Sequence, residues 1–556
     1  MRTVRVRYAP SPTGALHLGG LRTALFNYLF ARRHGGAFLL RVEDTDRART
    51  VPGAVEGIVR ALDWAGITPD EGPFLSAAGE LRERGDAGPY TQSNRLGAYR
   101  AAADALVESG AAYCCFCAAA RLAAMRDANA AAGARGLAYD RACAHLPRAE
   151  STARVARGEP HVVRLRVPPG ETRIRDVILG DVVFAHADVD DAVLLKSDGW
   201  PTYHLASVVD DAAMKVSHVI RGQEWLPSAP KHSLLYRALG IAPPAWAHIP
   251  LLLNADRSKL SKRAGHASVE DFRSAGFTAP ALIEFVASLG WTPPTGAGAD
   301  VAALAKAFDL GAVHKANAVA DRSRLDSISN QHVRASVVNA LSAAAPHALE
   351  PSRKRATGGT SAALIVREGA LPMELESAPS LDVLRAGVEP FLPRGLAARV
   401  TAARMNALLA LQHERVGPLS EFSSLVTPFL LSGGAPEYLE YLSGTAATAA
   451  RGRALGSAAD DTPALSALAA AIRDTGARWT RLSDPLDFGR VAVDAIKAAA
   501  LAAEMPPGRL MLPVRWALTG LDVGASLSDT LRFLGREEAI VRLDVAANIL
   551  VVSGRK

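Results

Sequence analysis

The stretch from Ala9 to Arg32, APSPTGALHLGGLRTALFNYLFAR, sets a turn rich in proline and glycine before apolar residues at helical spacing. The alternating segment TVRVRYA (residues 3–9) precedes it, and AFLLRVEDTD follows from Ala37. Alternation with a period of two predicts a strand. Strand, glycine-rich turn, helix and strand in this order predict the βαβ unit of a doubly wound parallel sheet. The expected fold class is therefore α/β, with a Rossmann-type domain at its start.

Three polar residues fall at one edge of this predicted sheet. Ligands of such sheets bind beyond the carboxyl ends of the strands, where Arg7, His17 and Glu43 are expected. A helix N-terminus attracts anions because its first backbone N–H groups are unpaired and carry partial positive charge. Gly19 and Gly20 would let a phosphate approach that backbone closely. His17, Gly19 and Gly20 are therefore predicted to bind the phosphates of a nucleotide.

A basic turn further along the chain fits the same ligand. The segment DRSKLSKR (256–263) sets Lys259 and Lys262 three residues apart around Ser261. Taken alone, such a segment is a solvated basic loop. Together with the first turn, it predicts a cationic loop that closes over a triphosphate. Lys262 would neutralise charge that develops as the α-phosphate is attacked. Lys259 is predicted to assist it, and Ser261 and Arg263 to bind ATP.

Length, composition and charge restrict the classes of protein. A chain of 556 residues is too long for a single core, so several domains are expected. No run of about 18 uncharged apolar residues occurs, and the first residues lack the pattern of a signal peptide, so we expect a cytoplasmic protein with no membrane span. The net charge of +7 suits a nucleic acid partner, although a solvated basic surface would explain it equally.

The pattern of apolar residues changes along the chain. Residues 1–95 and 196–325 are predicted to form the catalytic domain, in which 70–90 is a loop and the sheet resumes over 203–221. Residues 96–195 are predicted to form an inserted domain, with helices to about 147 and strands over 160–195. Helical periodicity then dominates, so 326–556 is predicted to be an all-α region with an insertion or linker near 340–360.

The paired segments HLGG and KLSKR resemble the two signature motifs of class I aminoacyl-tRNA synthetases. The surrounding segments RYAPSPTGALHLGGLRTALFNYLFAR, RVEDTDRART and HVIRGQEWLPSAPKH are similar to those of bacterial-type glutamyl-tRNA synthetases. The resemblance covers residues 1–330 strongly and 508–542 more weakly. It implies a glutamate–tRNA ligase that makes glutamyl adenylate from L-glutamate and Mg-ATP and then transfers glutamate to the 3′-terminal ribose of tRNA(Glu). It further implies an inserted domain that binds the tRNA acceptor end, a helical region that binds the anticodon, and a monomer.

The resemblance also implies how glutamate is recognised. Two carboxylates call for two guanidinium groups, and Arg7 and Arg221 stand at predicted strand ends, where each can bind a carboxylate with two hydrogen bonds. Which arginine takes which carboxylate is left open. Glu43 is expected to accept the ammonium group. The remaining members of the predicted glutamate site are Ala9, Ser11, Tyr203, Ser207, Glu224 and Trp225.

All four cysteines lie between Cys114 and Cys143. Clustered thiols in a cytoplasmic protein indicate a metal site before they indicate disulfides. Cys115, Cys117, Cys143 and His145 offer three thiolates and one imidazole, which is a tetrahedral set suited to one structural Zn²⁺. Cys114 is left over and could compete as a ligand. The alternative is that these are small buried thiols without a metal.

Several other classes of protein share similar motifs with the ligase. A truncated paralogue that glutamylates a tRNA base would lack the region after 325, and a glutaminyl enzyme would carry β-barrels there. A small-molecule nucleotidyltransferase would not need this length. A ligase that also charges tRNA(Gln), and a catalytically silent tRNA-binding homologue, both remain open at this stage.

Overall fold

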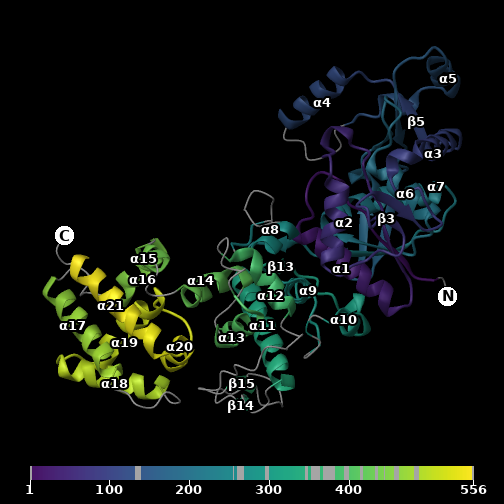
Figure 1. Ribbon diagram of the computed structural model, residues 1–556. Helices are drawn as coiled ribbons and strands as arrows, with labels where there is room; N and C mark the ends of the chain where they lie inside the picture. Colours follow the sequence, from purple (N-terminus) through teal and green to yellow (C-terminus); the bar gives the residue numbers. More distant parts are fainter. Residues whose placement is uncertain are drawn as a thin grey trace. The chain divides into compact units, whose positions relative to one another are not determined.

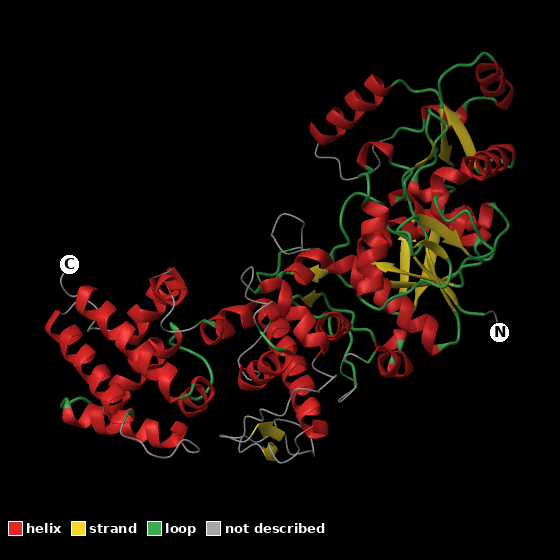
Figure 2. Cartoon of the chain, viewed as in Figure 1, coloured by secondary structure: helices red, strands yellow, loops and turns green. Residues whose placement is uncertain are grey.

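The computed structural model describes residues 3–131, 139–254, 256–258, 268–294, 298, 300–344, 349–351, 364–366, 382–392, 400–412, 418–431, 436–443, 445–455, 462–480 and 488–553. The chain divides into two compact units, Met1–Arg273 with Ala279–Arg322 and Ser274–Thr278 with Ser323–Lys556. The labels of Figure 1 name the elements. Figure 2 shows that most strands belong to the first unit. None of the helices in the described ranges combines the length and apolar character that a bilayer span demands.

The predicted βαβ unit is present at the start of the chain. Strand β1 (Arg5–Tyr8) pairs in parallel with β2 (Ala37–Leu40), and helix α1 (Leu18–Arg33) connects them. The apolar residues at helical spacing predict a helix over 21–32, but the helix begins at Leu18 because His17 caps it. Both strands are buried over their last three residues, as expected for a parallel sheet covered on both faces.

The sheet continues on the other side of β1. The backbone N–H of Ser217 donates to the carbonyl of Arg5 at 2.8 Å, which places β10 (His218–Gly222) beside β1. Strand β11 (Ala245–Ile249) follows in parallel, then β7 (Glu171–Asp176), with β8 (Gly180–Ala185) antiparallel at the edge. The Rossmann-type fold class is therefore confirmed. The β7–β8 hairpin, which comes from the segment expected to be inserted, shares this sheet.

Two local predictions in this unit are wrong. Residues 203–213 form helix α6 (Tyr203–Ala213) and not a strand, because Leu205, Val208 and Ala212 recur at helical spacing and pack inward. The predicted loop at 70–90 contains a hairpin of β3 (Gly72–Leu75) and β4 (Leu81–Arg84). All four residues of β4 are exposed, so it lacks the alternation that marks a half-buried strand, and backbone pairing alone defines it.

The first unit also contains a separate three-stranded antiparallel sheet. Its order is β5 (Ala112–Cys115), β6 (Val162–Leu165) and β9 (Val193–Leu195). Figure 1 shows β5 among the helices α3, α4 and α5. The remaining helices and strands of the unit are α2 (Ala54–Trp64), α3 (Leu96–Glu108), α4 (Ala119–Ala131), α5 (Arg148–Ala156), α7 (Ala229–Ala238), β12 (Leu252–Leu253), α8 (Val269–Ser274), α9 (Ala279–Ala287), α10 (Val301–Ala307) and β13 (Ala318–Val319).

The second unit is helical, as predicted, except for the hairpin of β14 (Leu349–Pro351) and β15 (Leu364–Val366). One apolar core includes Phe422 and Leu408, and a second surrounds the buried Trp479 and Trp516. Its helices are α11 (Arg322–Ala344), α12 (Asp382–Val388), α13 (Ala402–Gln412), α14 (Leu419–Leu430), α15 (Pro436–Ser443), α16 (Thr445–Leu455), α17 (Thr462–Trp479), α18 (Phe488–Ala502), α19 (Pro507–Thr519), α20 (Leu527–Leu534) and α21 (Arg536–Ser553).

Two adjacent glycines before β2 allow a test of this pairing. A methyl group on Gly36 would collide with the backbone carbonyl of Val4, which accepts a hydrogen bond from Ala37. We expect Gly36→Ala to lower the free energy of unfolding of the first unit by about 2–4 kcal/mol. Gly35→Ala is the control, because Gly35 has a φ of 59° but open space around it, and it should cost about 1 kcal/mol. Denaturant unfolding measures both, and equal losses would contradict the packing argument.

Candidate active site

A cavity of about 630 Å³ lies at the carboxyl ends of β1 and β10. Residues from strand ends, from the start of α1 and from α6 line it. Eleven of the sequence-predicted site residues are in this lining: Arg7, Ala9, Ser11, His17, Gly19, Gly20, Glu43, Tyr203, Arg221, Glu224 and Trp225. Ser207 is not in the lining. It is 1% exposed on α6, one turn beyond Tyr203, and its hydroxyl has no hydrogen-bond partner among the described residues.

The turn before α1 is held by its own histidine. Nδ1 of His17 accepts a hydrogen bond from the backbone N–H of Gly20 at 3.0 Å, so His17 is the N-cap of the helix. In the neutral ring the proton is then on Nε2, which makes that nitrogen a donor. Gly20 has a packing role, since an added Cβ would lie 2.5 Å from the hydroxyl of Tyr8 and 2.9 Å from Leu16. The helix start can therefore lie close against β1.

The predicted lysine loop lies outside the described residues, and with it Lys259, Ser261, Lys262 and Arg263. The described residues on either side adjoin the cavity. Strand β12, which leads into the loop, contributes Leu252 to the cavity lining. On the far side, Ser268 forms an antiparallel bridge with His17, and the N–H of Val269 donates to the carbonyl of Leu16 at 2.8 Å. Both ends of the basic segment are therefore anchored beside the turn of His17.

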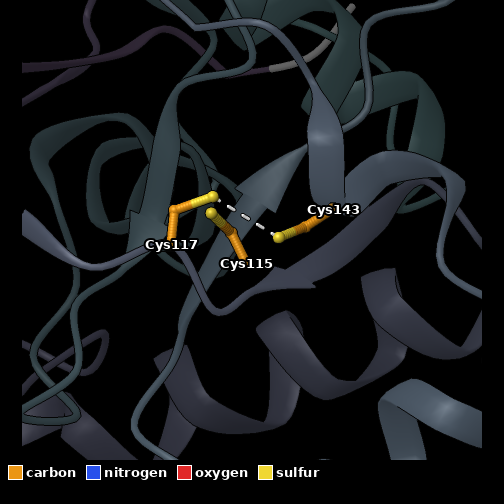
Figure 3. A group of neighbouring side chains, drawn as sticks. All are labelled: Cys115, Cys117 and Cys143. Atoms are coloured by element: carbon orange, nitrogen blue, oxygen red, sulfur yellow. Dashed lines mark hydrogen bonds between the residues drawn. The ribbon is translucent and has the colours of Figure 1, made fainter. Parts of the chain in front are cut away.

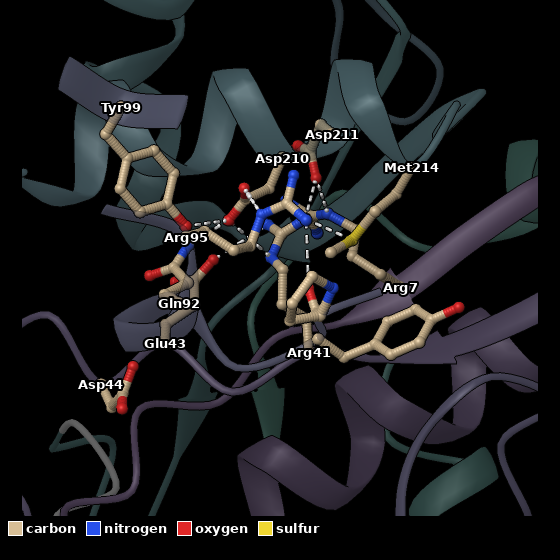
Figure 4. A network of polar contacts seen from close by, with 12 residues as sticks. Arg7, Arg41, Glu43, Asp44, Gln92, Arg95, Tyr99, Asp210, Asp211 and Met214 are labelled. Atoms are coloured by element: carbon tan, nitrogen blue, oxygen red, sulfur yellow. Dashed lines mark hydrogen bonds and ion pairs between the residues drawn. The ribbon is translucent and has the colours of Figure 1, made fainter. Parts of the chain in front are cut away.

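Arg7 binds the buried carboxylate of Asp211, and Glu43 binds the buried guanidinium of Arg41 (Figure 4). Nε and Nη2 of Arg7 donate to the two carboxylate oxygens of Asp211 at 2.9 and 3.2 Å. Nη1 of Arg41 donates to Asp211 at 2.6 Å, and its Nη2 donates to Oε1 of Glu43 at 2.9 Å. Burial raises the pKa of Glu43 above its ordinary value, although Arg41 and Arg7 oppose that rise. Arg41 and Asp211 thus orient two of the predicted glutamate-binding residues.

Arg221 has a different environment. Arg221 as a whole residue is 4% exposed, and its guanidinium carbon lies 5.0 Å from the centre of the Trp246 ring. Nε donates to Nε2 of His248 at 3.1 Å, and Nη2 donates to the carbonyl of Trp225 at 3.2 Å. Nη1 donates to the hydroxyl of Tyr203 at 2.9 Å and to Nδ1 of His232 at 3.2 Å. The structure places no carboxylate within ion-pair distance of Arg221 among the described residues.

Three of the four predicted metal ligands converge (Figure 3). The sulfur atoms of Cys115, Cys117 and Cys143 all lie within 4.8 Å of one another. His145 lies outside this group, with an exposed side chain at the end of a short 3₁₀ turn. The hydroxyl of Tyr139 takes that place, at 3.2 Å from the sulfur of Cys115 and 3.7 Å from that of Cys117. The arrangement offers a metal three sulfur ligands and one phenol oxygen.

Sequence reasoning did not find five residues that shape these sites: Arg41, Tyr139, Asp211, His232 and His248. Arg41 stands in the RVEDTD segment, and Tyr139 lies four residues before Cys143, so local patterns could have included both. Asp211, His232 and His248 come from α6, α7 and β11. Only the packing of these elements on the sheet brings them to the site.

Comparisons with known proteins agree with this architecture. The family described as tRNA synthetases class I (E and Q), catalytic domain, matches residues 3–327, and an anticodon binding domain family matches 384–547. A protein named glutamate–tRNA ligase from Dehalococcoides mccartyi is 37% identical over 98% of this chain and 97% of its own length. One from Clostridioides difficile is 46% identical over 60% of this chain and 67% of its own length.

A solved structure is similar over the whole chain. The crystal structure of a glutamate tRNA ligase from Elizabethkingia meningosepticum, in complex with its amino acid, has a TM-score of 0.70 and 29% sequence identity to this chain. The match covers 99% of this chain and 100% of that one.

The charge of Asp211 gives stability a defined pH dependence. Burial raises the pKa of Asp211, but Arg7 and Arg41 outweigh burial and hold it below its ordinary value. Its contribution is therefore complete above the unfolded-state pKa of about 3.9 and is lost as pH falls through the folded-state pKa. We expect Asp211→Asn to lower the free energy of unfolding at pH 7 by about 3 kcal/mol. The difference from the unmodified chain should shrink as the pH falls below about 4.

Denaturant unfolding across this pH range provides the measurement. Asp181→Asn is a matched control, because Asp181 faces Arg175 at the surface with 47% of its side chain exposed. That change should cost less than about 1 kcal/mol at any pH. If the difference in unfolding free energy between Asp211→Asn and the unmodified chain does not vary with pH, the stabilising role given to the charge of Asp211 is contradicted.

Proposed function

The chain belongs to the class I tRNA synthetase family of glutamate and glutamine enzymes and is a glutamate–tRNA ligase, and we propose that the cavity beside Arg7 and Arg221 is where it activates L-glutamate. In the first step, an oxygen of the α-carboxylate of glutamate attacks the α-phosphorus of Mg-ATP. The bond from that phosphorus to the bridging oxygen breaks, and glutamyl adenylate and pyrophosphate form. A hydroxyl of the 3′-terminal ribose of tRNA(Glu) then attacks the activated carbonyl, and AMP leaves.

The buried, uncompensated charge of Arg221 carries the proposal for glutamate recognition. Arg221 is 4% exposed and has no acidic partner in the described part of the chain, so a carboxylate of the substrate would balance the charge of its guanidinium. Arg7 binds Asp211 through Nε and Nη2, which leaves Nη1 for the second carboxylate. Glu43 binds Arg41 through Oε1, which leaves Oε2 for the ammonium group. Ala9, Ser11, Tyr203, Glu224 and Trp225 complete the walls, and Ser207 follows Tyr203 by one turn of α6.

ATP is proposed to bind where α1 begins. Backbone N–H groups at the start of this 16-residue helix and Nε2 of His17 supply donors for phosphate oxygens, and Gly19 lines the cavity there. Lys259, Ser261, Lys262 and Arg263 lie in the segment whose ends adjoin His17, so they would approach the same phosphates. Mg²⁺ would come with ATP and stabilise the negative charge of the phosphates. The protein itself contributes positioning and positive charge, with no covalent intermediate.

The partners and domains follow from the family. Residues 1–95 and 196–325 are proposed to be the catalytic part, 96–195 to hold the acceptor end, and 326–556 to bind the anticodon of tRNA(Glu), in line with the anticodon-binding match over 384–547. A monomer in the cytoplasm, where ATP and tRNA are available, fits these partners. Charging of tRNA(Gln) as well is the alternative that the aminoacylation experiment below decides.

One structural Zn²⁺ is proposed to bind the thiols. Cys115, Cys117 and Cys143 have the softness and the mutual distances that zinc requires. The Tyr139 oxygen, and not His145, is proposed as the fourth ligand, because the tyrosine hydroxyl lies 3.2 and 3.7 Å from two of the sulfur atoms, whereas His145 lies outside the group. Such an ion would connect strand β5 to the 3₁₀ turn at Ala142–His145 and stabilise this part of the first unit.

Glutamate-dependent activity and the role of Arg221 can be tested together. With tRNA(Glu) present, the purified chain should exchange pyrophosphate into ATP with glutamate and should aminoacylate tRNA(Glu). Arg221→Ala should raise the KM for glutamate by about 100-fold and leave the KM for ATP within about twofold, because the charge that it removes is proposed to bind the amino acid and not the nucleotide. An unchanged KM for glutamate would remove Arg221 from the site. Absence of any exchange would favour the silent tRNA-binding alternative, and parallel assays with tRNA(Gln) measure discrimination.

Metal analysis of the purified protein tests the zinc proposal. About one zinc per chain is expected, and Cys143→Ser should abolish binding because it removes one of three thiolates. His145→Ala, the control, should retain the metal, whereas Tyr139→Phe should weaken its retention against a chelator. Loss of zinc in His145→Ala with retention in Tyr139→Phe would reverse the assignment of the fourth ligand.

A further inference from the structure

The hydrogen-bond acceptors of Arg221 are all uncharged groups. They are two histidine nitrogens, a tyrosine hydroxyl and a backbone carbonyl, at 2.9–3.2 Å. Arg7, which lines the same cavity, binds the carboxylate of Asp211 with two hydrogen bonds. The two arginines of the proposed glutamate site therefore differ in kind. The charge of Arg7 is balanced within the protein, whereas Arg221 is held in place but not balanced.

The protonation states of the histidines around Arg221 follow from simple donor and acceptor rules. Arginine only donates, so Nε2 of His248 and Nδ1 of His232 must both accept and carry no proton. The proton of His248 is then on Nδ1, which donates to Asp176 at 2.6 Å. The proton of His232 is on Nε2, which lies 3.2 Å from Nδ1 of His204. Both rings that contact the guanidinium are therefore neutral.

The surroundings keep these rings neutral. Burial, followed by the charge of Arg221, lowers the pKa of His232 well below its ordinary value. Burial and then the charge of Lys231 lower the pKa of His204 to about 4. The carboxylate of Asp176 is separated from the guanidinium by the His248 ring. It is already saturated by the N–H groups of His248, Ile178 and Leu179.

A neutral acceptor and a carboxylate would orient the guanidinium equally well. They differ in whether the positive charge of the guanidinium is still unbalanced when the substrate binds. A carboxylate at this distance would cancel the charge of Arg221, and the site would then accept an uncharged side chain without penalty. Arg7 acts electrostatically on Glu43, the proposed ammonium acceptor, so Arg7 is assigned the α-carboxylate and Arg221 the side-chain carboxylate. With neutral acceptors, the buried charge of Arg221 is then balanced only when the substrate side chain brings a carboxylate. Glutamine keeps the α-carboxylate but has an amide in place of the side-chain carboxylate, so it leaves the guanidinium of Arg221 uncompensated.

We propose that His232 and His248 are positioning residues that set the preference for glutamate over glutamine. They fix Arg221 with uncharged acceptors and so reserve its charge for the side-chain carboxylate of the substrate. The proposal rests on the proposed role of Arg221 in binding glutamate. Neither histidine is among the residues that line the cavity, so both act through Arg221 and not by touching the substrate.

The decisive experiment compares His232→Asp with His232→Asn. Both side chains can place an oxygen near the position of Nδ1, both lose the contact with His204, and they differ in one charge. Pyrophosphate exchange in the presence of tRNA(Glu) is measured with glutamate and with glutamine. Relative to His232→Asn, His232→Asp should show kcat/KM for glutamate lowered by about 100-fold, mainly through KM, with an unchanged KM for ATP. The ratio of glutamine to glutamate kcat/KM should rise by a similar factor.

The opposite outcomes are distinct. Equal glutamate-to-glutamine ratios in the Asp and Asn variants, with both folded by circular dichroism and thermal melting, would overturn the proposal even if Arg221→Ala raises the KM for glutamate. An Arg221→Ala variant with an unchanged KM for glutamate would instead overturn the proposed function of Arg221. If either substitution at His232 prevents folding, His248→Glu and His248→Gln provide the same comparison of a charged with an uncharged acceptor, here for the Nε of Arg221. The shift in the ratio is again expected only for the charged variant.

Discussion

The ion pair between Arg41 and Asp211 is the constraint on which the site depends. Arg41 follows directly on β2, and Asp211 lies on α6, 170 residues further along the chain. Arg41 is completely buried and Asp211 nearly so, and a charge in that environment needs a partner at hydrogen-bond distance. Because Asp211 also binds Arg7 and Arg41 also binds Glu43, one buried contact orients an arginine on β1 and a glutamate after β2. The geometry of the proposed amino acid site is thereby tied to the packing of α6 on the sheet.

Arg221 shows the opposite use of burial. Its neighbours among the described residues satisfy its hydrogen bonds but provide no carboxylate to balance its charge. That arrangement destabilises the free protein relative to one with a carboxylate beside Arg221, and binding of an anionic substrate relieves it. Two guanidinium groups at neighbouring strand ends thus serve different purposes. Arg7 is oriented by an ion pair with Asp211, and Arg221 is oriented by hydrogen bonds to uncharged groups.

The end of the cavity where the nucleotide is proposed to bind is built by backbone geometry more than by charge. The ring of His17 caps α1, Gly20 admits the hydroxyl of Tyr8, and Ser268 pairs with His17 at the end of the basic segment. These contacts place a helix N-terminus and the Nε2–H group of the neutral His17 ring at the sheet edge. They also place both ends of a lysine-rich loop there. A site for a polyphosphate of this kind requires few side-chain contacts, because the donors are already oriented.

The sequence alone determined the βαβ start, the helical second half and the glycine-rich turn at His17. Short-range patterns predict those features: apolar residues with a period of two in 3–9, apolar residues at helical spacing after His17, and the glycines that follow His17. It also indicated Arg7, Glu43 and Arg221, since the order of elements placed them at the ends of parallel strands. Tertiary structure decided the rest. Segment 203–213 is a helix because its apolar residues face the core, and β4 exists only through its pairing with β3.

Asp211, His232 and His248 became part of the site when α6, α7 and β11 packed on the sheet, and Tyr139 joined the thiols through a fold of the chain between β5 and the turn at 142–145. No local pattern carries such information, because the partner that keeps a buried group charged or neutral is chosen by distance in space and not by distance along the chain.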